Sequence, residues 1–426
     1  MRIGLIGYGR VGQAVSWLLE RHAGEYARRL GEALELTTVL CRDTLRERER
    51  PAPDGALYTD EERDFFAREH DLVVDCAAHG PRAEALVLRA VEGGCDVVTA
   101  NQTLIATRGE ELFALAEARR VRIGFEGALA GGLPLTGALV HGMGANRVTE
   151  FAALLSATCN AVLTKMERDD VSFSEALAAA RGAGITHPDT AHDVSGRDTA
   201  EKLAIVASVM YQRRVNVERI RTTGIDRLTE EDQRLARELG HTIRLVARAQ
   251  ETHSGVYLRV APMLVDRREP IASVLGARCA AFLVGDACGR VMMTGEGAGA
   301  QPAASAVVSD ILRIGALRSH RGPGRLNAWP VGADELAIAP AGETIKRFYV
   351  RIPVTDHETG VRAFLDHLRR HETEIRTLHE LAGMLVMITE PTSRHRLDDV
   401  LDSAPSSGLS LNERVTLRVY TPEWAL

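Results

Sequence analysis

A lysine and an aspartate four residues apart are the clearest sign of chemistry in this sequence. Asp198 and Lys202 follow Gly196, and on a helix that begins near this glycine the two side chains share one face. A protonated lysine in such a pair can give its proton to a carbonyl oxygen as a hydride arrives at the carbonyl carbon. The carboxylate keeps the ammonium charged and oriented. The spacing therefore indicates proton transfer coupled to hydride transfer.

The same segment also has a structural explanation. Ser195 and Asp198 have the spacing of a capping box, in which the serine caps the helix and the acid reaches back to the free amide. Lys202 is harder to explain in this way, because only three of the 52 basic residues are lysines. A lysine kept among so many arginines indicates a task that needs a titratable amine.

A glycine-rich turn near the N-terminus predicts a site for a dinucleotide. The strand-like residues 1–5 lead into Gly7, Gly9 and Gly12 in the pattern GxGxxG, and apolar residues at helical spacing follow. In this context the glycines permit a tight turn and a close approach of the backbone to a pyrophosphate, which the helix N-terminus attracts. The alternative is a tight turn with no ligand.

Further strands predict where the rest of the cofactor lies. A strand at 34–40 is followed by Arg42, and an arginine at this place suits the 2′-phosphate of NADP. Asp43 is adjacent, so NAD remains an alternative cofactor. Strands at 72–76, 96–100 and 121–126 alternate with helical patterns at 82–92 and 110–119. Ligands of such sheets bind at the carboxyl ends of the strands, so we expect the turns 77–81 and 99–102 to border the nicotinamide.

The order of elements predicts an α/β protein of three domains. Residues 1–130, completed by about 296–320, read as a Rossmann-type doubly wound domain, and 131–295 as an α+β domain for substrate binding and dimerisation. A linker at 321–342 leads to a βαββαβ pattern at 343–426, which is the ferredoxin-like order.

Composition excludes several classes of function. A formal net charge of −6, without a long basic run, argues against binding of nucleic acid. The six cysteines are widely spaced, so we expect buried thiols rather than disulfides or a zinc site. No apolar stretch approaches the roughly 20 residues that cross a bilayer, and the N-terminus does not read as a leader. We therefore expect a cytoplasmic protein with a small-molecule substrate.

Taken together, the motifs resemble the homoserine dehydrogenase family over nearly the whole chain. The most specific of them is Asp193–Lys202, with the pattern DVxGxDxxxK. The others lie at 7–12, 97–101, 125–134, 163–166 and 297–302.

The resemblance implies an NAD(P)-dependent enzyme that interconverts L-aspartate 4-semialdehyde and L-homoserine. It assigns catalysis to Lys202 and Asp198, and substrate binding to the positions Thr158, His187, Asp193 and Gln102. It assigns the cofactor to Gly7, Gly9, Arg10, Val11, Gly12, Ala77, Thr99, Ala100, Asn101 and Gly297. It assigns a sodium or potassium ion to Glu126 with the carbonyl groups of Leu129, Gly131 and Leu133.

The sequence departs from the family pattern at four places beside the expected substrate, and two of them replace a charged residue. Gln102 stands where the family has a lysine, and His187 aligns with the glutamate that receives the ammonium of homoserine. Loss of a charged contact of that kind costs about 1.5–3 kcal/mol. Two alternatives therefore stay open, namely a relative that acts on another aldehyde or alcohol, and a non-catalytic relative that binds dinucleotide and amino acid.

The C-terminal pattern resembles an ACT domain, which implies an amino-acid effector. Thr359 replaces the usual proline in the turn 356–361, so a sheet that serves only dimerisation is the alternative. The family resemblance also implies a homodimer or a homotetramer.

Overall fold

The computed structural model describes residues 1–77, 80–186, 189–318, 327–340 and 344–421 of the 426-residue chain. The chain packs into two compact units that interleave along the sequence. Unit 1 comprises 1–157, 198–220 and 277–336, and unit 2 comprises 158–197, 221–276 and 337–426. Within the described ranges, no helix is long and apolar enough to cross a membrane.

Unit 1 is built around a six-stranded sheet whose strands are all parallel, in the order β3-β2-β1-β4-β5-β6. This order and the alternation with helices confirm the predicted doubly wound, Rossmann-type fold. The strands are β1 (Arg2–Ile6), β2 (Glu35–Leu40), β3 (Leu57–Thr59), β4 (Leu72–Asp75), β5 (Asp96–Thr99) and β6 (Ile123–Gly124).

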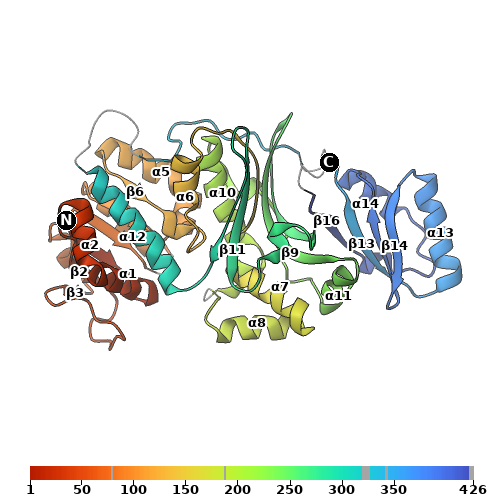
Figure 1. Cartoon of the computed structure of the whole chain (residues 1–426), viewed down its shortest axis with the longest axis horizontal. Coiled ribbons are helices and arrows are strands. Elements are labelled where there is room, and N and C mark those ends of the chain that lie inside the picture. The colour runs from red at the N-terminus through yellow and green to blue at the C-terminus, as the bar shows by residue number, and fades with distance from the viewer. Residues whose placement is uncertain (78–79, 187–188, 319–326, 341–343, 422–426) are drawn as a thin grey trace. The chain divides into compact units, whose positions relative to one another are not determined.

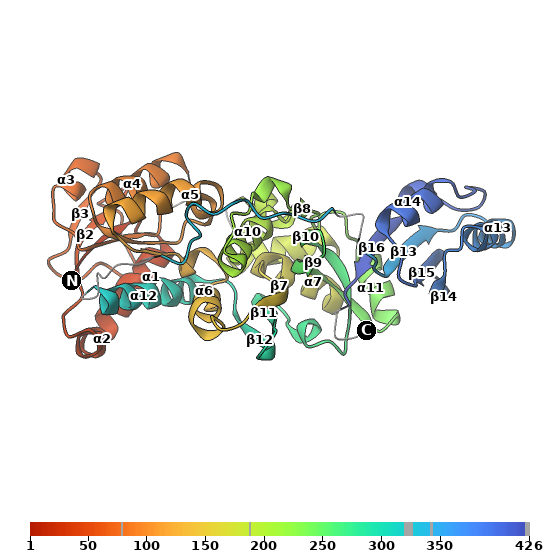
Figure 2. The ribbon, with the colours of Figure 1, turned by 90° about the horizontal axis from the view of Figure 1, so that it is seen from above.

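Helices cover both faces of this sheet. Figure 2 shows α1, α2 and α12 on one face and α3, α4 and α5 on the other. Apolar side chains from β1 and β4 pack against Val307 and Ile311 of α12, although α12 lies some 300 residues along the chain. The helices are α1 (Arg10–Arg21), α2 (Ala23–Leu30), α3 (Glu62–Phe66), α4 (Pro81–Glu92), α5 (Gln102–Arg119) and α12 (Ala300–Leu317).

The rest of unit 1 contains a three-stranded antiparallel arrangement and the helix that carries the lysine–aspartate pair. β7 pairs with β11, and β11 pairs with β12. The elements are η1 (Glu126–Ala128), α6 (Leu135–Gly137), η2 (Ala138–Gly142), β7 (Val148–Leu154), α10 (Arg197–Tyr211), η3 (Val217–Arg219), β11 (Arg278–Gly285) and β12 (Gly289–Glu296).

Unit 2 combines a long β-hairpin with a C-terminal βαββαβ segment (Figure 1). The hairpin strands β9 and β10 pair along their full length, and β10 also pairs with β16 in parallel. In the first part of the unit lie α7 (Ala157–Asp169), α8 (Phe173–Gly182), α9 (Thr190–Val194), β8 (Arg221–Thr222), α11 (Glu230–Glu238), β9 (His241–Thr252), β10 (Gly255–Asp266) and η4 (Pro270–Ser273). The C-terminal segment contains β13 (Phe348–Pro353), α13 (His357–Arg370), β14 (Ile375–Leu381), β15 (Met384–Thr389), α14 (Arg394–Asp402), η5 (Leu411–Glu413) and β16 (Val415–Val419).

The C-terminal segment has the predicted ferredoxin-like order. Its sheet runs β16-β13-β15-β14, and both of its helices pack on one face of the sheet around Phe348, Phe364 and Leu397. The three sequence domains 1–130, 131–295 and 343–426 remain a prediction, because the packing units interleave these segments.

Several element boundaries differ from expectation. Helix α5 begins at Gln102 rather than at 110, because Asn101 caps it and accepts the N–H of Leu104. The strand expected at 121–126 is reduced to 123–124, and a 3-10 turn follows it. The expectation of six buried thiols is confirmed for Cys159 and Cys279, but Cys288 is exposed, and the other three cysteines are only half-buried.

Candidate active site

The turn between β1 and α1 is tightly packed at Gly7 and Gly12 and has free space at Gly9, where a phosphate would lie. Gly7 has a φ of +88°, and a Cβ on Gly7 would lie 2.6 Å from the backbone of Ala77. A Cβ on Gly12 would lie 2.2 Å from the carbonyl oxygen of Gly7, whereas a Cβ on Gly9 meets no described atom within 4 Å. Helix α1, which begins at Arg10, has no acid in its first turn and no side-chain cap among the described residues. The turn and helix therefore fit an anionic group.

A buried aspartate joins the turns that follow β4 and β5. Asp75 accepts a hydrogen bond from Thr99 Oγ1 at 2.8 Å and one from the N–H of Ala77 at 3.0 Å. Thr99 Oγ1 in turn accepts the N–H of Asn101 at 2.9 Å, and Ala100 lies between them. Burial raises the pKa of Asp75 to about 6. The Nδ2 atom of Asn101 is buried and has no hydrogen-bond partner in the described part of the chain.

Arg42 lies exposed just after β2, and it makes no hydrogen bond or ion pair with a described residue. The carboxylate of Asp43 is used within its own loop, because it accepts the N–H groups of Leu45 and Arg46 at 3.0 Å each. Arg48 lies 5.0 Å from the ring of Tyr58, so a second arginine stands near this strand end.

The lysine–aspartate pair forms on α10 as its spacing predicts. Lys202 Nζ donates to Asp198 Oδ2 at 2.9 Å and to the carbonyl oxygen of Leu155 at 3.1 Å. Only 12% of the Lys202 side chain and 14% of the Asp198 side chain are exposed. The capping-box explanation for Asp198 is wrong, because the N–H of Ser195 donates to Ala191 instead.

Gln102 joins α5 to the helix that carries this pair. Its Nε2 atom donates to the backbone oxygen of Asp198 at 3.1 Å and to Glu201 Oε2 at 2.9 Å. Thr103 Oγ1 donates to the same carboxylate at 3.2 Å. Gln102 is 5% exposed and Glu201 is 1% exposed, so this is a buried polar contact between two helices of unit 1.

Two predicted substrate residues meet in unit 2. Thr158 Oγ1, on α7, donates to Asp193 Oδ2 at 3.0 Å, and both side chains are buried. Cys159 Sγ bonds to the backbone oxygen of Asp193, so the end of α9 is fixed to the start of α7. His187 lies outside the described residues.

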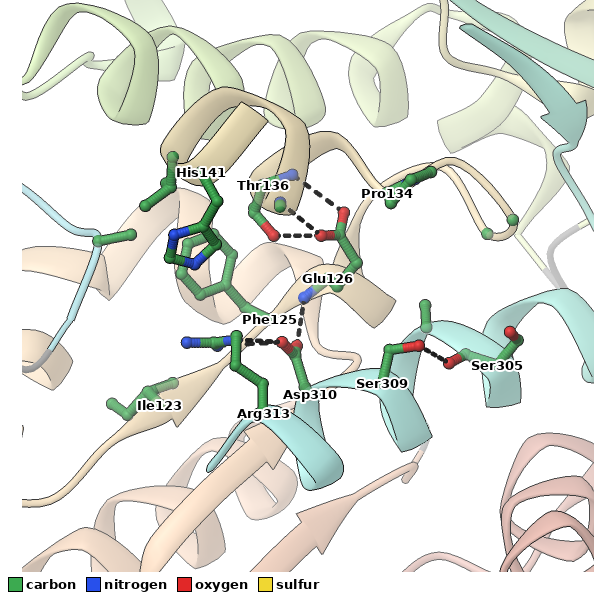
Figure 3. A pocket seen from close by; sticks show the side chains of 16 residues that line it. Ile123, Phe125, Glu126, Pro134, Thr136, His141, Ser305, Ser309, Asp310 and Arg313 are labelled. Atoms are coloured by element: carbon green, nitrogen blue, oxygen red, sulfur yellow. Dashed lines mark hydrogen bonds and ion pairs between the residues drawn. The ribbon is translucent and has the colours of Figure 1, made fainter. Parts of the chain in front are cut away.

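Glu126 borders a cavity of about 340 Å³ in unit 1 (Figure 3). Its buried carboxylate caps α6, because it accepts N–H groups from Thr136 and Gly137 as well as the Thr136 hydroxyl. Its own N–H donates to Asp310 at 2.8 Å. Burial raises the pKa of both carboxyl groups. The carboxylate of Glu126 therefore already accepts hydrogen bonds within the fold.

The loop after Glu126 packs against the end of β12. The N–H of Gly132 donates to the carbonyl oxygen of Glu296, and a Cβ on Gly131 would lie 3.1 Å from the carbonyl oxygen of Gly297. Gly297 is itself confined, because its Cβ would lie 2.2 Å from Cys279 Sγ. The carbonyl oxygen of Leu133 accepts the N–H of Leu135.

Comparisons with known proteins agree with this arrangement. The model of the homoserine dehydrogenase NAD-binding domain matches residues 7–126, and the homoserine dehydrogenase model matches residues 134–312. The homoserine dehydrogenase of Neisseria gonorrhoeae is 34% identical over 361 residues, which cover 84% of this chain and 82% of that protein. The chain belongs to the homoserine dehydrogenase family.

Further relatives extend the match to nearly the full length. The homoserine dehydrogenase of Pseudomonas aeruginosa is 32% identical over 94% of each chain. The crystal structure of the homoserine dehydrogenase of Thiobacillus denitrificans superposes with a TM-score of 0.88 and 30% identity, and the match covers 99% of this chain and 98% of that one. Members of this family are NAD(P)-dependent oxidoreductases that act on a CH–OH group, and this chain is an enzyme of that class.

Three contributors to this homoserine dehydrogenase site were not predicted from the sequence. Asp75 could have been suspected, because it is an acid at the end of a buried strand, where ligands of parallel sheets bind. The carbonyl group of Leu155 and the carboxylate of Glu201 carry no such signal, because their roles depend on tertiary contacts.

Proposed function

We propose that this chain interconverts L-aspartate 4-semialdehyde and L-homoserine by hydride transfer, with Lys202 and Asp198 as the catalytic residues. The observation that supports this proposal most is the shielded contact between Lys202 Nζ, Asp198 Oδ2 and the oxygen of Leu155. Two acceptors fix the amine, and low exposure strengthens its attraction to the carboxylate.

In the direction of reduction, Lys202 donates a proton to the carbonyl oxygen of the aldehyde. The nicotinamide supplies the hydride when it is bound. Asp198 keeps the ammonium protonated and oriented before the transfer and retains the neutral amine afterwards. In the direction of oxidation, Lys202 accepts the proton of the alcohol.

We assign the cofactor to the turn of β1 and α1 and to the ends of β4 and β5. The open space at Gly9 and the N-terminus of α1, which has no side-chain cap, support a pyrophosphate there. The Nδ2 atom of Asn101 has no described acceptor, which supports a hydrogen bond from it to an amide oxygen of the cofactor. Arg42 lacks a described partner, which favours the 2′-phosphate of NADP over NAD. The assigned residues are Gly7, Gly9, Arg10, Val11, Gly12, Arg42, Ala77, Thr99, Ala100, Asn101 and Gly297.

We assign substrate binding to Thr158, Asp193, His187 and Gln102. The hydroxyl of Thr158 and the carboxylate of Asp193 are already in contact, so they can act together on one polar group of the substrate. Gln102 would act on the substrate indirectly, because its amide is bonded to the backbone oxygen of Asp198 and helps to position this residue; it supplies no positive charge.

Three further assignments rest on the family resemblance, and the division into three domains rests on the order of the predicted elements. A sodium or potassium ion would depend mainly on the carbonyl groups of Leu129 and Gly131, since Glu126 caps α6 and Leu133 accepts an internal bond. The C-terminal segment would bind an amino-acid effector, and the chain would form a homodimer or a homotetramer. Its three domains would follow the sequence boundaries given above.

Purified protein with NADPH or NADH and aspartate semialdehyde tests the function directly. Lys202→Arg keeps the charge but loses easy proton transfer, so we expect kcat to fall by about 10²–10⁴-fold. Lys165→Arg is the matched control, because Lys165 forms an i,i+4 pair with Asp169 at 2.6 Å on the exposed surface. Wild-type protein without turnover, or full activity of Lys202→Arg, would contradict the proposal.

A further inference from the structure

Glu201 is a buried carboxylate that directly precedes the proposed catalytic lysine on α10. Successive residues of a helix point in directions about 100° apart, so Glu201 and Lys202 face different neighbours. The amine of Lys202 contacts Asp198 and Leu155, whereas the carboxylate of Glu201 contacts α5. Glu201 is 1% exposed, and a carboxylate shielded in this way depends on the hydrogen bonds that it accepts.

The carboxylate of Glu201 holds the first turn of α5. Its Oε2 atom accepts Gln102 Nε2 at 2.9 Å and Thr103 Oγ1 at 3.2 Å, and these donors are the first two residues of that helix. The N-terminus of a helix carries partial positive charge, and α5 has no acid in its own first turn. Glu201 therefore supplies both an acceptor and a negative charge to the start of α5.

The start of α5 is also the end of the turn that follows β5. Asn101 caps the helix by accepting the N–H of Leu104 at 3.1 Å, and its own N–H donates to Thr99 Oγ1. Gln102 follows Asn101 and donates through its Nε2 atom to the backbone oxygen of Asp198 as well as to Glu201. Hydrogen bonds within unit 1 therefore join the turn assigned to the cofactor to the helix that carries the catalytic pair.

We propose that Glu201 is a positioning residue for hydride transfer. By holding Gln102 and Thr103, it fixes the end of the cofactor turn relative to Asp198 and Lys202. A displacement of about 1 Å between reacting groups can cost about 10²-fold in rate, so a contact of this kind can matter without touching the substrate. This role rests on the proposed function, because it requires the hydride acceptor to lie beside Lys202.

The rate of a single turnover tests this role. Full-length protein in excess over NADPH is mixed with aspartate semialdehyde, and the loss of NADPH absorbance is followed by stopped flow. Glu201→Leu removes the acceptor, so we expect the rate per bound NADPH to fall by about 10²-fold. A merely structural role would lower the number of NADPH-binding sites, which a fluorescence titration counts, and would leave the rate at each site unchanged.

Two further variants separate the contact from a general weakening of α5. Glu201→Gln keeps an oxygen that can accept both donors, so its rate should stay within about tenfold of the wild type. Glu117→Leu is the matched control, because Glu117 lies near the other end of α5 and accepts an amide N–H of Asn327 at 3.2 Å. It should lower the free energy of unfolding but keep the wild-type rate per bound NADPH.

Each contrary outcome has a distinct meaning. A wild-type rate in Glu201→Leu, or a rate in Glu201→Gln as low as that of Glu201→Leu, overturns the positioning role. An equal loss in Glu117→Leu also overturns it, because any weakening of α5 would then suffice. Wild-type protein that does not reduce aspartate semialdehyde overturns the proposed function itself, and the positioning role with it.

Discussion

At the scale of single residues, two lysine–aspartate pairs of the same chemistry differ in their exposure to solvent. Lys202 with Asp198 and Lys165 with Asp169 are both i,i+4 pairs on helices, at 2.9 and 2.6 Å. The second pair is exposed, so solvent screens it and its contribution to stability is small. The first pair is shielded and has a further acceptor in Leu155, which gives its amine one orientation. Position in the fold therefore decides which lysine can do chemistry.

Gln102 gives a prediction at the same scale. Gln102→Leu leaves the carboxylate of Glu201 and the oxygen of Asp198 without this donor, so the free energy of unfolding should fall by about 1–3 kcal/mol. Gln102→Lys restores a donor to both groups and should cost less. Urea unfolding measures the difference, and kcat with saturating cofactor should fall in the leucine variant, because Asp198 is less well held. Equal stability of the two variants would show that the contact contributes nothing.

At the scale of elements, the sequence predicts the strands and helices wherever burial follows hydrophobicity. Strands β1, β2, β4 and β5 of unit 1 and the βαββαβ segment follow this rule. Strand β9 does not, because Arg244 and Arg248 are almost fully buried in it, and a charged residue at an inward position hides the strand pattern. The start of α5 was missed for a similar reason, since Gln102 is a polar residue buried by a contact 99 residues away. Such contacts also decide the geometry of the candidate site. Sequence motifs name the residues of the site but do not give their arrangement in space.

The ends of β4 and β5 give a prediction about pH. Asp75 has a pKa of about 6 in the fold, above the ordinary aspartate value of 3.8, so the folded state favours its neutral form and loses stability as pH rises through this window. The free energy of unfolding of the wild type, minus that of Asp75→Asn, should fall by up to about 3 kcal/mol between pH 4 and pH 7. Urea unfolding at several pH values measures it. A difference that does not change with pH would show that Asp75 ionises freely.

At the scale of the whole molecule, the assigned roles divide between the two packing units. The turns assigned to the cofactor and the Asp198–Lys202 pair lie in unit 1, whereas Thr158 and Asp193 lie in unit 2. The spacing of the motifs does not reveal this division, because the segment 193–202 contributes to both units. One continuous motif therefore carries residues with two different tasks.

Hydrogen exchange can test this division, because a bound ligand slows the opening of the segments that it contacts. We expect NADPH alone to slow exchange in peptides that contain 7–12, 75–77 and 99–102. These segments include the open space beside Gly9 and the Nδ2 donor of Asn101, which has no described hydrogen-bond partner. L-Homoserine added with oxidised cofactor should extend protection to peptides that contain Thr158 and Asp193, because a substrate group would join their hydrogen bond. Lys202→Arg should show the same protection without turnover, which separates binding from proton transfer. Protection by homoserine that leaves Thr158 and Asp193 unchanged would remove both from the substrate site and would place recognition entirely on unit 1.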